Sequence, residues 1–285
     1  MFMKKEKAML LLSVAIFGTI GLLRRNLLCS SGFLALTRAV IGAVFLLALV
    51  LLKKQKPDFA AIRKSGLLLA LSGAALGFNW IFLFEAYNHT SVATATVCYY
   101  LAPIIVILLS PVLFQEKLNR KQQICAAAAL AGLVAVSGLL DTGFSGWEEL
   151  RGVAFALAAA GLYACVMICN KKITGIGPYE KTISQLFLAA AVMLPYVLLT
   201  ENLSQIQVPP NALFLLMVAG IVHTGIAYWL YFGSMGALKA HTVALYSYLD
   251  PILAIILSLL VLKEPMTPAA VIGSILVLGS AFFSE

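Results

Sequence analysis

Hydrophobic residues occur in long runs along this chain, and short polar or charged stretches separate the runs. Most runs have about the length that an α-helix needs to cross a bilayer, roughly 20 residues. The connections are too short for a soluble domain. The pattern therefore predicts an all-α integral membrane protein with ten transmembrane helices, near Ala8–Leu23, Gly32–Leu52, Ser65–Tyr87, Val92–Phe114, Gln122–Leu140, Gly152–Asn170, Thr182–Leu199, Asn211–Tyr231, Ala240–Leu262 and Ala269–Phe283.

The first run, Ala8–Leu23, follows three lysines and has the layout of a secretory signal peptide. No pair of small residues around a variable one directly precedes Arg24 and Arg25, where cleavage would be expected. The run also has a counterpart later in the chain. We therefore expect it to be retained as the first span.

Composition agrees with a membrane setting, since 62% of the residues are hydrophobic and only 11% are charged. The net charge of +8 would suggest nucleic acid in a soluble protein, but no basic and aromatic surface of useful length exists here. If the N-terminus is cytoplasmic, 15 of the 20 basic residues fall in cytoplasmic segments and four in outer ones. The positive-inside rule then predicts a multi-pass protein of the cytoplasmic (inner) membrane with both termini in the cytoplasm.

The chain repeats itself. The segment Tyr99–Glu116 aligns without gaps on Ser247–Glu264, and Ala15–Thr19 falls on Gly161–Cys165 with nearly the same shift. Two five-span halves, residues 1–145 and 146–285, follow from this alignment. Five is odd, so the second half starts on the opposite side of the membrane, which is the inverted repeat of many secondary transporters. The matched positions include Tyr100 with Tyr248, Pro103 with Pro251 and Glu116 with Glu264.

These features resemble the drug/metabolite transporter superfamily, of the EamA type. The resemblance rests on "YLAP" and "YLDP", on the glutamate that ends each of these spans, and on the glycine-rich segment Gly273–Ala281. It covers nearly the whole chain and implies a solute carrier whose central cavity is lined mainly by spans three, four, eight and nine. Relatives of this type export amino acids and other metabolites, and some carry sugars, nucleotide sugars or small cations.

Pro103 and Pro251 interrupt matched spans, and such interruptions are the best sequence indication of a transporter's binding site. The alternative is that each proline only kinks its helix for packing. Asp250 aligns with Ala102, so its carboxylate is not required by the repeat. It could hold a substrate ammonium group or carry a coupling proton, or it could bond backbone groups freed by a helix break.

Three further ionisable residues suit coupling or gating: Arg38, Glu85 and His241. Arg38 and Glu85 fall toward the outer ends of spans two and three, so they could form an ion pair. Alternatively, they could meet the carboxylate and the amine of an amino acid. Glu116 and Glu264 are interpreted as structural residues at the ends of their spans.

Aromatic residues concentrate in the spans expected to line the cavity. Some would belong to the interfacial belts, and others could stack on a solute or bind an organic cation. Asn79 is a candidate hydrogen-bond donor to substrate, or a partner of another helix. The candidate substrate-binding residues are Asn79, Trp80, Tyr99, Tyr100, Tyr228, Trp229, Tyr246 and Asp250.

The favoured function is secondary transport of small metabolites by alternating access, and specifically proton-coupled export of amino acids or similar amphipathic solutes. The alternative is a carrier of organic cations or drugs that uses Glu85, Asp250 and aromatic residues. A non-transporting membrane protein or an enzyme is not favoured, because the chain has no intramembrane catalytic motif. We expect no cofactor, no metal and no nucleic acid, and partners limited to a small solute, lipid, protons and, in a homodimer, a second copy.

Overall fold

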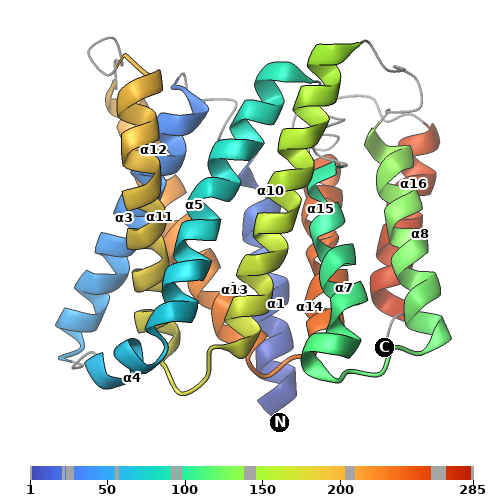
Figure 1. The fold of residues 1–285 in the computed structure, drawn as a ribbon, viewed down its shortest axis with the longest axis horizontal. Helices are drawn as coiled ribbons and strands as arrows, with labels where there is room; N and C mark the ends of the chain where they lie inside the picture. The colour runs from blue at the N-terminus through green and yellow to red at the C-terminus, as the bar shows by residue number, and fades with distance from the viewer. Residues whose placement is uncertain are drawn as a thin grey trace. The chain divides into compact units, whose positions relative to one another are not determined.

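The computed structural model describes residues 2–20, 23, 29–54, 58–90, 95, 98–137, 146–202, 209–257 and 268–283. Every regular element in these ranges is helical (Figure 1). The helices are α1 Phe2–Gly18, α3 Ser31–Leu52, α4 Phe59–Lys64, α5 Gly66–His89, α7 Leu101–Phe114, α8 Arg120–Ser137, α10 Trp147–Lys172, α11 Pro178–Thr200, α12 Pro210–Gly220, the π-helix η2 Ile221–Ile226, α13 Ala227–Met235, α14 Ala240–Ser247, α15 Leu249–Leu257 and α16 Pro268–Phe283.

Within the described ranges, five helices are long and apolar enough to cross a membrane: α3, α5, α10, α11 and the continuous run of α12, η2 and α13. Helix α7 is apolar but shorter. The predicted all-helical class agrees with this architecture, and the count of ten spans stays a prediction. Helix α1 also begins and ends several residues earlier than the predicted first span.

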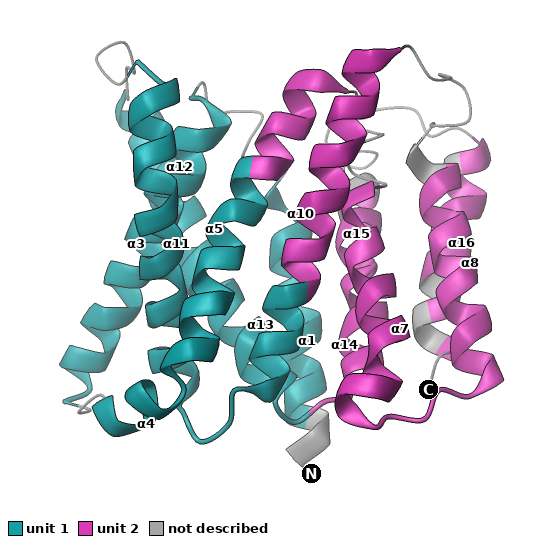
Figure 2. Cartoon of the chain, viewed as in Figure 1, with its two compact units in different colours: residues 1–81, 165–237 teal, residues 82–164, 238–285 magenta. Residues whose placement is uncertain are grey.

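The chain forms two compact units (Figure 2). The first unit contains residues 1–81 and 165–237, and the second contains residues 82–164 and 238–285. Each unit therefore takes segments from both sequence halves. Within the first unit α3 packs on α11, and within the second α7 packs on α14 and α8 packs on α16. These are repeat-related helices, so matched parts of the two halves meet inside each unit.

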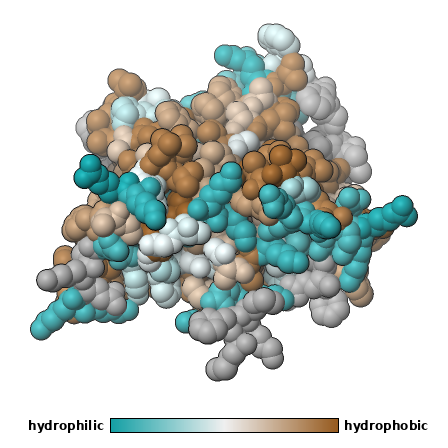
Figure 3. Space-filling model, turned by 60° about the horizontal axis from the view of Figure 1, so that its bottom comes forward, coloured by the Kyte–Doolittle hydropathy of each residue, from teal (hydrophilic) through white to brown (hydrophobic). Residues whose placement is uncertain are grey.

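Large hydrophobic side chains remain exposed on many helices. Leu52 is 80% exposed, Leu199 86% and Val112 78%. Hydrophobic side chains also lie open at the surface in Figure 3, next to hydrophilic clusters. Hydrocarbon at this exposure is unfavourable in water and suits the apolar interior of a bilayer.

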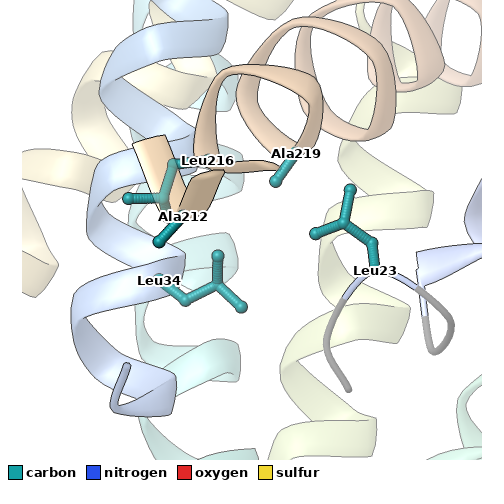
Figure 4. Packing of buried hydrophobic residues seen from close by; sticks show 5 residues of the cluster. All are labelled: Leu23, Leu34, Ala212, Leu216 and Ala219. Carbon is teal, nitrogen blue, oxygen red and sulfur yellow. The ribbon is translucent and has the colours of Figure 1, made fainter. Parts of the chain in front are cut away.

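The core of the first unit depends on small residues that bring backbones together. Leu34 of α3 packs with Ala212, Leu216 and Ala219 of α12, and with Leu23 (Figure 4). About two turns further along α3, a β-carbon on Gly42 would lie 2.9 Å from the carbonyl oxygen of Gly220. Such close approach is how helices associate where lipid removes the hydrophobic drive between them.

Two helices begin at matched positions just before a proline. Helix α14 ends at Ser247 and α15 begins at Leu249, so Pro251 is the third residue of a new helix. Pro103 is likewise the third residue of α7. A proline in the first turn removes no helical hydrogen bond, because N–H groups there have no intrahelical partner. The two prolines therefore stand at chain breaks and do not kink a continuous helix.

Candidate functional site

Asp250 lies in the first turn of α15, where the helix dipole favours a negative charge. The Tyr100 hydroxyl donates to its Oδ2 atom at 2.9 Å. The hydroxyl of Tyr248 donates in turn to the carbonyl oxygen of Tyr100 at 2.8 Å. Because Tyr100 and Tyr248 are repeat mates, the two halves meet here through one residue and its own copy. Asp250 adds an asymmetric charge to this symmetric pair.

A row of tyrosines extends from this carboxylate within the second unit. The Tyr100 ring lies 6.2 Å from Tyr248 and 5.7 Å from Tyr99, between ring centroids. Tyr99 stacks on Tyr163 of α10 at 5.5 Å. Sequence analysis did not select Tyr163 as a site residue. The repeat alignment could have indicated Tyr163, because Tyr163 is the counterpart of Phe17, and Phe17 packs on the candidate residue Tyr228.

The first unit holds a second aromatic cluster. Trp80 of α5 meets Tyr228 of α13 edge-on at 6.1 Å, and Phe17 of α1 meets Tyr228 at 5.0 Å. Trp80 is 3% exposed and Tyr228 6%. The guanidinium carbon of Arg38, on α3, lies 4.6 Å from the centroid of the Trp80 ring. Trp80 and Tyr228 are also repeat mates, so this cluster again joins a residue to its copy.

The remaining substrate-binding candidates are Asn79, Tyr246 and Trp229, on α5, α14 and α13. Asn79 is fully buried on α5, and Tyr246 is half-buried on α14. Trp229 stacks on Tyr179 at 5.1 Å, and Lys53 donates to the Tyr179 hydroxyl. Trp229 thus belongs to a cluster at one end of the first unit. Contact of these three residues with a solute stays a prediction.

Glu85 lies near the end of α5 among polar residues of the second unit. Asn88 donates to its Oε2 atom at 3.4 Å, and the His89 ring nitrogen is 4.0 Å away. His89 also contacts Glu148 at 2.8 Å. Arg38 belongs to the other unit, so the Arg38–Glu85 ion pair stays a prediction.

A shallow groove of about 340 Å³ lies close to these residues, lined by Phe82, Arg151, Ala154, Phe155 and Ala158. Its wall is mostly aromatic and aliphatic, and Arg151 is held by Glu148 through an exposed ion pair of 3.1 Å. An exposed pair of this kind contributes little to stability.

His241 belongs to a hydrogen-bonded network at the start of α14. Asn119 and Gln122 form a capping box at the start of α8, in which the Gln122 oxygen accepts from the Asn119 backbone at 3.0 Å. The Gln122 amide nitrogen therefore points to His241 Nε2, at 2.9 Å. Since that ring nitrogen accepts, Nδ1 carries the proton and donates to Glu116 at 3.1 Å. Glu264, the repeat mate of Glu116, lies outside the described residues.

His223 occupies the π-helix, a distortion that occurs frequently at functional sites. Its Nε2 atom lies 2.8 Å from the hydroxyl oxygen of Thr19. The Thr19 hydroxyl also donates to the carbonyl oxygen of Ile16. The other ring nitrogen of His223, Nδ1, lies 3.4 Å from the carbonyl oxygen of Val218. The Thr19–His223 hydrogen bond joins the residue that follows α1 to η2.

A fully buried polar network in the first unit was missed by sequence analysis. Asn170 donates to Ser72 at 3.1 Å, and Gln185 donates to Ser72 at 2.9 Å and to Asn170 at 3.2 Å. All three side chains have no exposed surface. They join α5, α10 and α11, and their spacing along the chain held no signal of this contact.

We expect Asn170→Leu to lower the free energy of unfolding by about 2 kcal/mol, because Ser72 and Gln185 would lose partners while buried. Thermal unfolding of the purified protein in detergent measures this. Gln123→Leu is the matched control, since Gln123 is exposed on α8. Equal melting temperatures for the two variants would contradict the network.

Within the described residues, no group of three or more histidine, cysteine, aspartate or glutamate side chains could hold a metal ion. Cys165 and Cys169 lie with their sulfur atoms 3.9 Å apart on one face of α10.

Comparison with known proteins gives a family context. The profile of the EamA-like transporter family matches residues 5–138 and again residues 150–284. The uncharacterized transporter YxxF of Bacillus subtilis (strain 168) is 30% identical over 252 residues, which is 87% of this chain and 79% of that protein. Protein PecM of Dickeya dadantii (strain 3937) is 27% identical over 74% of this chain and 70% of its own. Protein RarD of Salmonella typhi is 27% identical over 78% and 74% respectively.

A solved crystal structure of a protein shares the fold. It superposes with a TM-score of 0.87 and covers 99% of this chain and 96% of its own, at 20% sequence identity. The fold is therefore one that has been observed by experiment.

Proposed function

We propose that this chain, which belongs to the EamA-like transporter family, exports amino acids or similar amphipathic solutes by proton-coupled alternating access. Membership of the family makes the chain a multi-pass membrane transporter of small solutes. The proposal includes the inner membrane as its location. Two halves related as an inverted repeat can exchange conformations and open a midplane site to each side in turn. The packing of repeat-related helices inside each unit supports this mode of transport.

The observation that carries the proton coupling is the Asp250–Tyr100 hydrogen bond of 2.9 Å. A carboxylate within an apolar span is costly, and it marks a proton or substrate path more often than a structural contact. Asp250 stands at the break before α15, beside the point where Tyr100 meets its copy Tyr248. A proton taken up there from the outer side would neutralise the carboxylate, release the Tyr100 hydroxyl and favour the change between the two access states.

We expect Asp250→Asn to lose solute accumulation driven by a pH gradient by about tenfold or more, while exchange of labelled for unlabelled solute continues. Flux into proteoliposomes, with and without a pH gradient, measures both quantities. Tyr100→Phe is the comparison variant, because it keeps the carboxylate and removes its hydrogen bond, and it therefore separates the effect of the charge from the effect of that bond. If Asp250→Asn accumulates solute as the wild type does at every pH, Asp250 is not the coupling residue.

A carrier of organic cations is the second candidate, and the tyrosine row favours it. The rings of Tyr99, Tyr100, Tyr163 and Tyr248 contact one another in a row, and the Tyr100 hydroxyl bonds to the Asp250 carboxylate. Cations bind to the faces of such rings through cation–π contact. Stabilisation of the purified protein by quaternary amines, together with no effect of amino acids, would favour this candidate over the first.

A further inference from the structure

Among the described residues of its own unit, Arg38 forms no ion pair with an acidic side chain. Arg38 is half-buried, and its Nε atom is enclosed and forms no hydrogen bond with any described residue. A guanidinium group stays protonated at any physiological pH and carries five N–H donors. The structure gives it one favourable contact, with the face of Trp80 at 4.6 Å.

Contact with an aromatic ring leaves the donors of the guanidinium unused. A guanidinium group held by cation–π attraction to a ring face keeps N–H donors for an acceptor atom of a ligand. The contact with Trp80 therefore holds the Arg38 head group in place without supplying a hydrogen-bond acceptor to it. A planar carboxylate fits the edge of a guanidinium group with two parallel hydrogen bonds.

The surroundings of Arg38 suit the apolar body of a ligand. Trp80 meets Tyr228 edge-on, and Tyr228 meets Phe17 edge-on at 5.0 Å between ring centroids. The cluster thus combines one guanidinium group with several aromatic rings.

We propose that the Arg38–Trp80 pair binds the carboxylate of the transported solute, and that the Trp80–Tyr228–Phe17 cluster packs against the solute's apolar part. This inference rests on the proposed transport of amphipathic solutes and names their class: carboxylates with an apolar or aromatic body. It separates the two roles within the chain, since Arg38 recognises the solute and Asp250 carries the proton. Trp80 acts here as a positioning residue for the guanidinium group as well as a contact surface.

The test compares ligands that differ only in the carboxylate. The probes are L-phenylalanine with L-phenylalaninamide, and phenylacetate with phenylacetamide. Thermal shift of the purified protein measures binding, and proteoliposome flux measures KM and kcat. We expect at least one carboxylate to stabilise the wild type while its amide does not. In Arg38→Gln, affinity for that carboxylate falls about tenfold or more, and KM rises with little change in kcat.

Arg38→Lys is the second variant, because it keeps the charge and loses the bidentate edge. It should bind the carboxylate with an affinity between those of wild type and Arg38→Gln. It can also be measured in place of Arg38→Gln if that neutral variant does not fold. Trp80→Leu should weaken binding of the same carboxylate by releasing the guanidinium group. A purely structural role would lower the melting temperature of these variants without separating acid from amide.

The inference fails if the amides stabilise the wild type as well as the acids do, or if none of the four probes stabilises it. It also fails if Arg38→Lys binds acids as tightly as the wild type does and Trp80→Leu changes nothing. The proposed function has a separate point of failure. Loss of pH-driven transport in every solute tested would overturn proton-coupled export, while selective binding of acids to the purified protein would still support the Arg38 site.

Discussion

Gly132→Val should lower the free energy of unfolding by about 3 kcal/mol or more, because it disrupts the packing of two helices. A β-carbon at Gly132 of α8 would lie 2.6 Å from the carbonyl oxygen of Gly273 on α16, and 2.9 Å from a methyl group of Val277. The first of these neighbours is backbone, so it moves only if the whole helix moves. The valine side chain adds two methyl groups to that conflict.

Thermal unfolding in detergent measures this effect, and we expect the midpoint to fall by about 8 °C. Gly279→Ala is the matched control on α16, because a β-carbon there meets nothing within 4 Å. Alanine is favoured over glycine inside a helix by about 0.5–1 kcal/mol, so the control should be neutral or slightly stabilising. A melting temperature of Gly132→Val within the error of the wild type would contradict the close crossing of α8 and α16.

The repeat was the most informative feature of the sequence. It paired Tyr100 with Tyr248, and the structure brings these two residues into direct contact. The ungapped shift between Tyr99–Glu116 and Ser247–Glu264 also relates Trp80 to Tyr228, which meet in the other unit. Residues related by a two-fold axis touch when they lie close to that axis. Internal sequence similarity thus carried information on contacts as well as on fold class.

Other features depend on contacts between distant segments and left no pattern in the sequence. The Ser72–Asn170–Gln185 network joins three helices through residues that look like isolated polar positions. The π-helix at His223 contains no proline, so nothing in its residue types marks the extra residue in that turn. Pro251 indicated a break in this helix. The break lies at Tyr248, about one turn before the proline, and this position depends on packing against other segments, which the local sequence does not reveal.

Sequence analysis interpreted Glu116 as a structural residue at the end of a span, and its hydrogen bonds in the structure define that role. Both of its carboxylate oxygens accept from the backbone N–H of Ala240, at 3.0 and 3.1 Å. Lys239 occupies the N-cap position of α14 and makes no side-chain cap of its own. Glu116 therefore caps α14 from the end of α7, and it fixes His241 by accepting from Nδ1.

Glu116→Ala should lower the free energy of unfolding by about 2–4 kcal/mol, because it removes a helix cap and leaves a buried imidazole N–H without an acceptor. The side chains of His241 and Glu116 are only 4% and 12% exposed, so water does not replace the lost bonds. Thermal unfolding measures the change. Glu148→Ala is the matched control, since its contacts with Arg151 and His89 are exposed and an exposed pair contributes less than about 1 kcal/mol.

The same variant tests whether this network acts as a gate. The network of Glu116, His241 and Gln122 joins the end of α7 to the start of α14 at the side predicted to be cytoplasmic. If it holds this side closed, its loss should raise solute exchange relative to pH-driven accumulation. His241→Leu should repeat that change, because leucine has neither the acceptor that Gln122 donates to nor the donor that Glu116 accepts from. If both variants are destabilised while the ratio of exchange to accumulation is unchanged, the network stabilises the fold and does not gate transport.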